Sequence, residues 1–106
     1  MAERFLRTEM LIGADGAAKL AQSRVAVFGL GGVGSFAAEA LARAGIGHLL
    51  LVDHDVVSVS NINRQLIALD STVGRAKVEI MAERIAAINP QAEVEPVCAF
   101  YAPQTR

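Results

Sequence analysis

The sequence predicts an α/β fold: a Rossmann-like parallel sheet with flanking helices, apparently only the N-terminal half of a doubly wound fold. Three observations lead to this prediction. Short apolar runs alternate with helical patterns along the chain, a glycine-rich turn separates the first run from a helix, and acidic residues close the second run. Alternation of this kind is typical of parallel strands joined by right-handed helical crossovers.

The chain begins with a helical segment, which is followed by a strand and a second helix. Residues 6–22 have a helical pattern that the glycine-containing stretch 13–16 interrupts. The run RVAVFG, residues 24–29, is short and β-branched, which is typical of a parallel strand buried on both faces. A helical pattern then covers residues 32–44, and Gly45 stands where a C-terminal cap belongs.

Two further strands and one helix are predicted in the rest of the chain. The run HLLLVD at 48–53 predicts a second buried strand, and the polar segment 56–65 that follows it is irregular. A helix is expected over 75–89, Pro90 prevents its continuation, and residues 92–100 form the third predicted strand. Apolar residues at steps of three and four mark the core face of that helix: Val78, Met81, Ile85 and Ile88.

The first strand has no neighbour on one side in this arrangement. In the usual strand order the strand at 24–29 is central, and a second half-sheet lies beside it. No residues remain for that half, so the apolar edge would be exposed and open to pairing with another chain. We therefore expect a fragment of a longer protein, or else a partner over the edge. Residues 1–22 are predicted as a helical segment and residues 23–106 as the N-terminal half of a nucleotide-binding domain.

Composition excludes several classes of protein. The chain has 106 residues and a net charge of −1, which gives no general attraction to nucleic acid or to membranes. No apolar run approaches the length of a membrane span, and the start MAERFLRTEM is not a secretory signal. Cys98 alone forms no internal disulfide, and within an apolar strand it is expected to be a buried small hydrophobe. A cytoplasmic protein is the expectation.

The glycine-rich turn predicts a nucleotide site. The sequence GLGGVG matches G-x-G-x-x-G between a strand and a helix. Gly29 would allow the tight turn, Gly31 and Gly32 would leave the backbone bare for a phosphate, and Gly34 would let helix and strand pack closely. Asp53 follows Gly34 by 19 residues, where a ribose hydroxyl is usually bound. The alternatives are a turn without a ligand and an aspartate that caps a helix or forms a loop ion pair.

Further polar residues favour a triphosphate over a dinucleotide. Lys77 lies in the first turn of a helix, where a cation opposes the helix dipole, so a separate reason for it is expected. Arg and Lys would neutralise β- and γ-phosphates, whereas a nicotinamide dehydrogenase leaves these residues without a task. The alternatives are solvated charges and turn-forming asparagines, and Asp55 is either a group that places a metal-bound phosphate or a plain loop acid. The polar residues in question are Asn61, Asn63, Arg64, Gln65 and Lys77.

Several motifs in series resemble those of a known superfamily. GLGGVGS, LVDHDVVSVSNINRQ, STVGRAK and INP, in this order and spacing, resemble the HesA/MoeB/ThiF superfamily of ATP-dependent adenylating enzymes, which are relatives of ubiquitin-activating enzymes. The likeness runs from RFLRTEMLIG to INPQAEV. Within the superfamily, RFLRTEMLIG, AAEALARAGIG and SNINRQLIAL are most similar to the tRNA threonylcarbamoyladenosine dehydratases.

The resemblance implies roles for individual residues. The loop from Gly29 to Gly34 would hold ATP and Asp53 its ribose, while Asn61, Arg64 and Lys77 would hold the phosphates and orient the α-phosphate. Arg7 matches an arginine that reaches the ATP of the neighbouring subunit in a homodimer, so residues 1–22 are expected to be associated with the dimer. The implied catalytic residues are Arg64, Lys77 and Arg7, and the implied nucleotide ligands are Gly29, Gly31, Gly32, Gly34, Asp53, Asp55, Asn61, Arg64 and Lys77.

The resemblance also implies the reaction and its partners. A carboxylate, in this branch that of the threonylcarbamoyl group on a tRNA adenosine, would be adenylated with ATP and Mg²⁺. The metal-binding aspartate of the family would lie beyond residue 106, so no metal ligand is predicted in this chain. Two alternatives stay open: an adenylyltransferase for a ubiquitin-like sulfur-carrier protein, and a nucleotide-binding fragment without catalysis.

Overall fold

The computed structural model describes residues 3–99, and its three strands form one parallel sheet. The strands are β1 (Arg24–Phe28), β2 (His48–Asp53) and β3 (Glu93–Cys98), in the order β1-β2-β3. Val27 pairs with Leu51, and Leu51 pairs with Pro96. The predicted strands are thereby confirmed within one or two residues, except that Phe100 lies outside the described residues.

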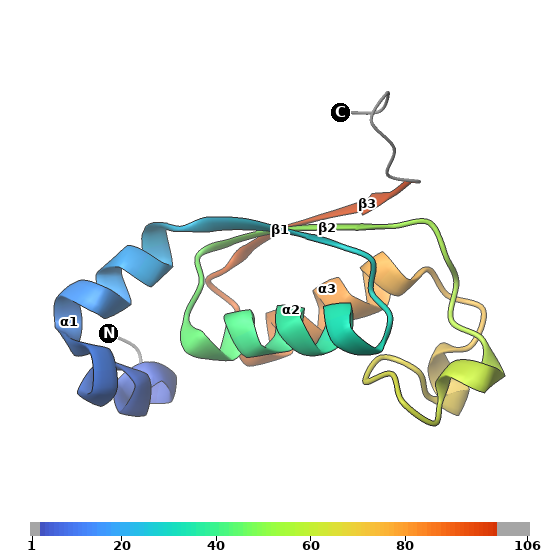
Figure 1. Cartoon of the computed structure of the whole chain (residues 1–106), viewed down its shortest axis with the longest axis horizontal. Coiled ribbons are helices and arrows are strands. Elements are labelled where there is room, and N and C mark those ends of the chain that lie inside the picture. Colours follow the sequence, from blue (N-terminus) through green and yellow to red (C-terminus); the bar gives the residue numbers. More distant parts are fainter. Residues whose placement is uncertain (1–2, 100–106) are drawn as a thin grey trace.

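Three helices and three short 3-10 turns complete the described chain. The helices are α1 (Leu6–Gln22), α2 (Gly32–Ala44) and α3 (Lys77–Ile88). Figure 1 shows α2 and α3 lying along the same face of the sheet, while α1 stands beyond the amino ends of the strands. The 3-10 turns are η1 (Glu3–Phe5), η2 (Val59–Asn61) and η3 (Asp70–Thr72).

Two glycines shape the helices as the sequence predicts. The backbone of α1 is not helical at Gly13, where φ is 80° and ψ is 167°, so α1 consists of two pieces. Gly45 caps α2 in the left-handed conformation. The helix expected from residue 75 begins two residues later, because residues 74–76 pair with the segment that leaves β2.

The hydrophobic core lies between the sheet and the pair α2 and α3. Leu49 and Leu51 point from β2 toward the helices, and the small side chains of Ala38 and Ala42 let α2 approach the strands closely. The predicted face of α3 is confirmed, since its apolar residues are part of this core or pack against it: Val78, Met81, Ile85 and Ile88. This packing fixes the start of α2 and the start of α3 beside the carboxyl ends of the strands.

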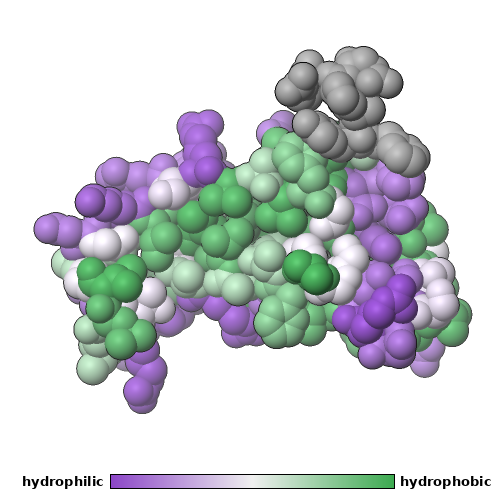
Figure 2. Space-filling model, in the orientation of Figure 1, coloured by the Kyte–Doolittle hydropathy of each residue, from purple (hydrophilic) through white to green (hydrophobic). Residues whose placement is uncertain are grey.

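The opposite face of the sheet and one edge of β1 are uncovered within residues 3–99. The prediction that the first strand is buried on both faces is wrong, because Arg24, Ala26 and Phe28 are exposed and Phe28 retains 51% of its accessible surface. Cys98 is likewise exposed rather than buried. Figure 2 shows hydrophobic residues gathered across the middle of the molecule, with hydrophilic residues toward both ends. None of the described helices is long and apolar enough to cross a membrane.

Candidate functional site

A cavity of about 430 Å³ opens at the carboxyl ends of β1 and β2. The turn after β1, the residues that follow β2 and the first residue of α3 form its walls. Carboxyl ends of parallel strands are the usual place for ligands in open α/β sheets. The residues that line the cavity are Phe28, Gly29, Gly31, Val52, Asp53, His54, Asp55, Lys77 and Ala99.

Two glycines of the turn are required by the fold itself. Gly29 has a φ of +89°, a conformation that other residues adopt only with strain. A Cβ on Gly34 would lie 1.7 Å from the carbonyl oxygen of Gly29, which leaves no space for a side chain. The expected roles of Gly29 in the turn and of Gly34 in close packing are therefore confirmed.

The other two glycines of the turn have no such explanation. Gly31 has a φ of −76°, and Gly32 has no positive φ either. A Cβ on Gly31 would meet Gln65 Nε2 at 3.9 Å, and one on Gly32 would meet the carbonyl oxygen of Arg64 at 3.7 Å, both ordinary contacts. The fold would therefore accept alanine at these two positions. What the glycines provide is a bare backbone at the start of α2, where unpaired N–H groups attract anions.

Asp53 joins the turn to the end of β2. Its Oδ2 accepts a hydrogen bond from the backbone N–H of Leu30 at 2.6 Å, and its Oδ1 accepts one from the N–H of Asp55 at 2.7 Å. The residue is 8% exposed. A carboxylate oxygen can accept more than one hydrogen bond, so this arrangement leaves capacity for a ribose hydroxyl at the cavity. The pattern of the sequence did not reveal that Asp53 also holds the turn in place.

Lys77 is brought to the cavity by the closing of the loop between β2 and α3. Val56 and Ala76 form an antiparallel bridge, and the backbone N–H of Lys77 donates to the carbonyl of Asp55 at 3.1 Å. Lys77 is only 5% exposed, and its Nζ lies 4.0 Å from Oδ2 of Asp55. A buried ammonium normally has close partners. A long ion pair to an exposed carboxylate leaves it suited to an additional anion.

Asn61 and Arg64 do not line the cavity. The Oδ1 of Asn61 accepts a hydrogen bond from the N–H of Ser58 at 2.9 Å, so its side chain stabilises the turn. The Nη1 of Arg64 donates to the carbonyl of Ser60 at 3.0 Å and to Oδ1 of Asn63 at 2.9 Å. The backbone of this segment does pack beside Gly31 and Gly32, so only the side chains are turned to their own loop.

Arg7 lies far from the cavity within one chain. It is exposed on α1, which Figure 1 shows at the end of the sheet opposite to the glycine turn. A contact between Arg7 and this cavity therefore needs a second copy of the chain.

Three consecutive residues offer donor atoms for a cation. One ligand atom each of Asp53, His54 and Asp55 lies within 4.8 Å of the others. These groups already have partners, because backbone N–H groups occupy Asp53 and the Nε2 of His54 lies 3.2 Å from Oδ1 of Asp55. The expectation that this chain supplies no metal ligand stays a prediction.

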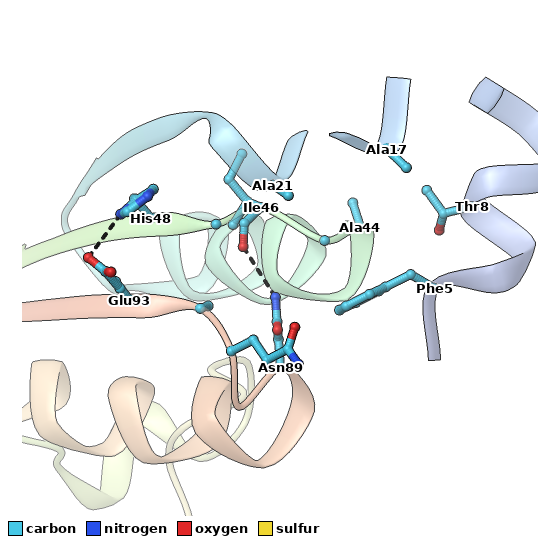
Figure 3. A pocket seen from close by; sticks show the side chains of 13 residues that line it. Phe5, Thr8, Ala17, Ala21, Ala44, Ile46, His48, Asn89 and Glu93 are labelled. Atoms are coloured by element: carbon cyan, nitrogen blue, oxygen red, sulfur yellow. Dashed lines mark hydrogen bonds and ion pairs between the residues drawn. The ribbon is translucent and has the colours of Figure 1, made fainter. Parts of the chain in front are cut away.

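A second cavity, of about 330 Å³, lies at the amino ends of the strands beneath α1 (Figure 3). There Asn89 donates from Nδ2 to the carbonyl of Ile46 at 3.2 Å, and Nδ1 of His48 lies 3.2 Å from Oε2 of Glu93. These polar groups hold parts of the chain together. The cavity at the carboxyl ends, with its bare backbone and its buried lysine, is therefore the candidate site.

One residue near the site was not assigned by its pattern. Gln65 is 7% exposed, and its Oε1 has no hydrogen-bond partner among the described residues. The sequence marks it only as one of several polar residues in NINRQ. Its position next to Gly31 depends on the path of the loop, which local patterns do not determine.

Comparison with known proteins gives a consistent result. The family model described as "ThiF family" matches residues 5–105. The tRNA threonylcarbamoyladenosine dehydratase of Bacillus subtilis (strain 168) is 56% identical over 105 residues, which are 99% of this chain and 41% of that protein. The molybdopterin-synthase adenylyltransferase of Escherichia coli (strain K12) is 47% identical over 86 residues, which are 81% of this chain and 34% of that protein. The chain thus spans less than half the length of these relatives.

Solved structures agree in fold. The tRNA N6-threonylcarbamoyladenosine dehydratase of E. coli in complex with ATP matches with a TM-score of 0.95 and 50% identity, covering 97% of this chain and 42% of that chain. The complex of that protein with AMP matches with a TM-score of 0.96, at the same identity and coverage.

Proposed function

Because the chain belongs to the ThiF family, we propose that the protein uses ATP to activate a substrate carboxylate as an acyl-adenylate. The observation that carries the proposal is the bare backbone at Gly31 and Gly32, which neither conformation nor packing requires and which a phosphate would cover. The buried Lys77 at the same cavity adds a cation for the phosphates. Relatives named as adenylyltransferases, and neighbours solved with ATP and AMP, support the same reading.

In the proposed reaction a carboxylate oxygen of the substrate attacks the α-phosphorus of ATP, the bond to the bridging oxygen breaks, and pyrophosphate leaves. The protein contributes positioning and charge neutralisation in the transition state. The N–H groups at the start of α2 would hold phosphate oxygens, and Asp53 would accept a hydrogen bond from the ribose. Lys77 would neutralise phosphate charge, and Arg64 would do the same once its guanidinium leaves Ser60 and Asn63.

Mg²⁺ would add charge neutralisation at the phosphates when bound. Among the residues described, Asp55 offers an exposed carboxylate at the cavity, and its Oδ2 lies 4.0 Å from the Nζ of Lys77. We assign Asp55 to the metal-bound phosphates, and the family's metal-binding aspartate is expected beyond residue 106.

The finer proposal concerns the substrate, N6-threonylcarbamoyladenosine in tRNA. After adenylation a nucleophile within the threonylcarbamoyl group would attack the activated carbon, close a ring and release AMP, so that the net change in the nucleoside is a dehydration. The identity of 56% with the Bacillus subtilis dehydratase supports this substrate. A tRNA substrate is also consistent with a cytoplasmic location.

The alternative is adenylation of the C-terminus of a ubiquitin-like sulfur-carrier protein. The identity of 47% with the E. coli molybdopterin-synthase adenylyltransferase favours it less strongly. Both reactions release pyrophosphate, so the acceptor distinguishes them.

Pyrophosphate release from ATP in the presence of each acceptor tests the proposal. We expect release with tRNA that carries threonylcarbamoyladenosine, and none with unmodified tRNA or with a sulfur carrier. Release with the carrier alone would support the alternative. Nucleotide binding without release with either acceptor would favour a module that has no catalysis of its own.

We also propose that the protein acts as a homodimer in which Arg7 reaches the ATP of the neighbouring subunit. Exposed apolar residues beside Arg7 on α1, such as Leu6 and Met10, are suited to such a contact. Mixing an Arg7→Ala protein with a Lys77→Met protein tests it. Two inactive variants should regain part of the activity on mixing if each supplies what the other lacks, whereas a mixture without activity would contradict a role in the neighbouring subunit.

A further inference from the structure

A buried amide lies next to the glycine at which the turn is bare. Gln65 is 7% exposed, and its Nε2 lies 3.9 Å from the point that a Cβ on Gly31 would occupy. Its Oε1 is buried without a hydrogen-bond partner in the described part of the chain. The amide nitrogen, a hydrogen-bond donor, thus faces the part of the turn where an anion would approach.

The backbone holds this side chain in position. The N–H of Gln65 donates to the carbonyl of Asn61 at 3.0 Å, and the carbonyl of Gln65 accepts from the N–H of Ala68 at 3.0 Å. Asn61 and Ala68 are themselves buried. Because the backbone is fixed at this point, little conformational entropy would be lost when the amide binds a ligand.

The unpartnered oxygen is unfavourable for the fold. A buried polar atom without a hydrogen bond destabilises a protein, and an apolar side chain of similar size would not carry this cost. A methionine would fill the volume of Gln65 equally well for packing. The polar residue is therefore better explained by a ligand than by the stability of the loop.

We infer that Gln65 is a phosphate-binding residue of this site, whose side-chain N–H donates to a phosphate oxygen held over Gly31. The inference rests on the proposed use of ATP. It gives the segment NINRQ a direct contact with the nucleotide that Asn61 and Arg64 do not make while their side chains are bound to their own loop.

Titration of the full protein with ATP, and separately with adenosine as a probe without phosphates, tests the inference. For Gln65→Met we expect an unchanged or higher unfolding temperature, an ATP affinity about tenfold to a hundredfold lower, and an unchanged adenosine affinity. Gln65→Glu places a carboxylate beside the phosphates, so its ATP affinity should be lower still. The matched control is Gln91→Met, an exposed glutamine at the other end of the sheet, which should bind ATP like the unchanged protein.

The possible outcomes separate the inference from the proposal beneath it. Unchanged ATP affinity in Gln65→Met, with ATP binding intact in the parent protein, overturns the role of Gln65 alone. A parent protein that does not bind ATP overturns both. An equal loss of ATP and adenosine affinity would show a structural role for Gln65 and contradict phosphate binding. If Gln65→Met does not fold, Gln65→Asn, which withdraws the amide by one methylene, provides the same comparison of ATP with adenosine.

Discussion

The carboxylate of Asp53 accepts a hydrogen bond of 2.6 Å from the backbone N–H of Leu30, although the two residues are separated by 23 positions in the chain. This bond ties the glycine turn after β1 to the end of β2. Leu30 itself is fully buried, so the turn is fixed from two sides. The bare backbone of Gly31 and Gly32 is therefore held ready at the cavity before any ligand binds, which lowers the cost of binding.

Asp53→Asn should weaken both the fold and nucleotide binding. An amide presents one acceptor oxygen, so one of the two N–H groups that Asp53 now binds would lose its partner. We expect the free energy of unfolding to fall by about 1–3 kcal/mol and ATP affinity to fall with it. Denaturant unfolding and ATP titration measure the two effects. Asp15→Asn on the exposed surface of α1 is the control, and an equal loss in that variant would contradict the account.

Alanine at two glycines of the same turn should have opposite effects. Gly31→Ala is accepted by backbone and packing, so the unfolding temperature should hold while ATP affinity drops. Gly34→Ala would place a methyl group 1.7 Å from the carbonyl oxygen of Gly29, and we expect it to cost about 3 kcal/mol or more of folding free energy. Thermal unfolding of each variant with and without ATP separates the cases. Full ATP affinity in Gly31→Ala would show that the turn only connects strand and helix.

Lys77→Met should reduce ATP affinity while the protein stays folded. The substitution removes a buried cation and retains its apolar stem, and the partner that it leaves, Asp55, is exposed to water. A charged hydrogen bond to phosphate is worth about tenfold to a hundredfold in affinity. Lys19→Met on α1 is the matched control. ATP binding that is unaffected in Lys77→Met would remove the lysine from the site.

The ion pair between α2 and α3 should make stability depend on acidic pH. Hydrogen bonding from Arg84 holds the pKa of Glu39 below its ordinary value of 4.5, against the opposing effect of burial, and Arg43 adds to the lowering. A carboxylate whose pKa is lower in the folded state stabilises the fold above its unfolded pKa, and this stability is lost as the pH falls through the folded pKa.

Glu39→Gln should therefore lower the free energy of unfolding by about 1 kcal/mol at neutral pH. Its difference from the parent should shrink as the pH falls below 4.5, where the parent carboxylate becomes protonated. Denaturant unfolding across this range measures both. Glu83→Gln removes an exposed ion pair with Arg75 and should have little effect at any pH. A pH-independent difference for Glu39→Gln would contradict the assignment.

The sequence was sufficient for the order of elements and for the family. The pattern of Val78, Met81 and Ile85 predicts the core face of α3 because helical periodicity is a local property. The motif resemblance is confirmed by the family match over residues 5–105. Exposure of Phe28 was not predicted, because the burial of a strand depends on neighbours that this chain does not supply.

The site could be predicted only in part. Gly29 and Gly34 have the roles that their spacing indicates, since backbone geometry determines both. The directions of Asn61, Arg64 and Gln65 depend on a loop whose path is set by the pairing of Val56 with Ala76, and local sequence does not encode that pairing. Their assignment as nucleotide ligands, like that of Arg7, stays a prediction.

Calorimetric titration of the protein with ATP plus Mg²⁺, and separately with NAD, tests the central claim most directly. The geometry of the turn and of Lys77 predicts that ATP binds and that NAD does not. Binding of NAD without ATP would contradict the account and favour a dehydrogenase.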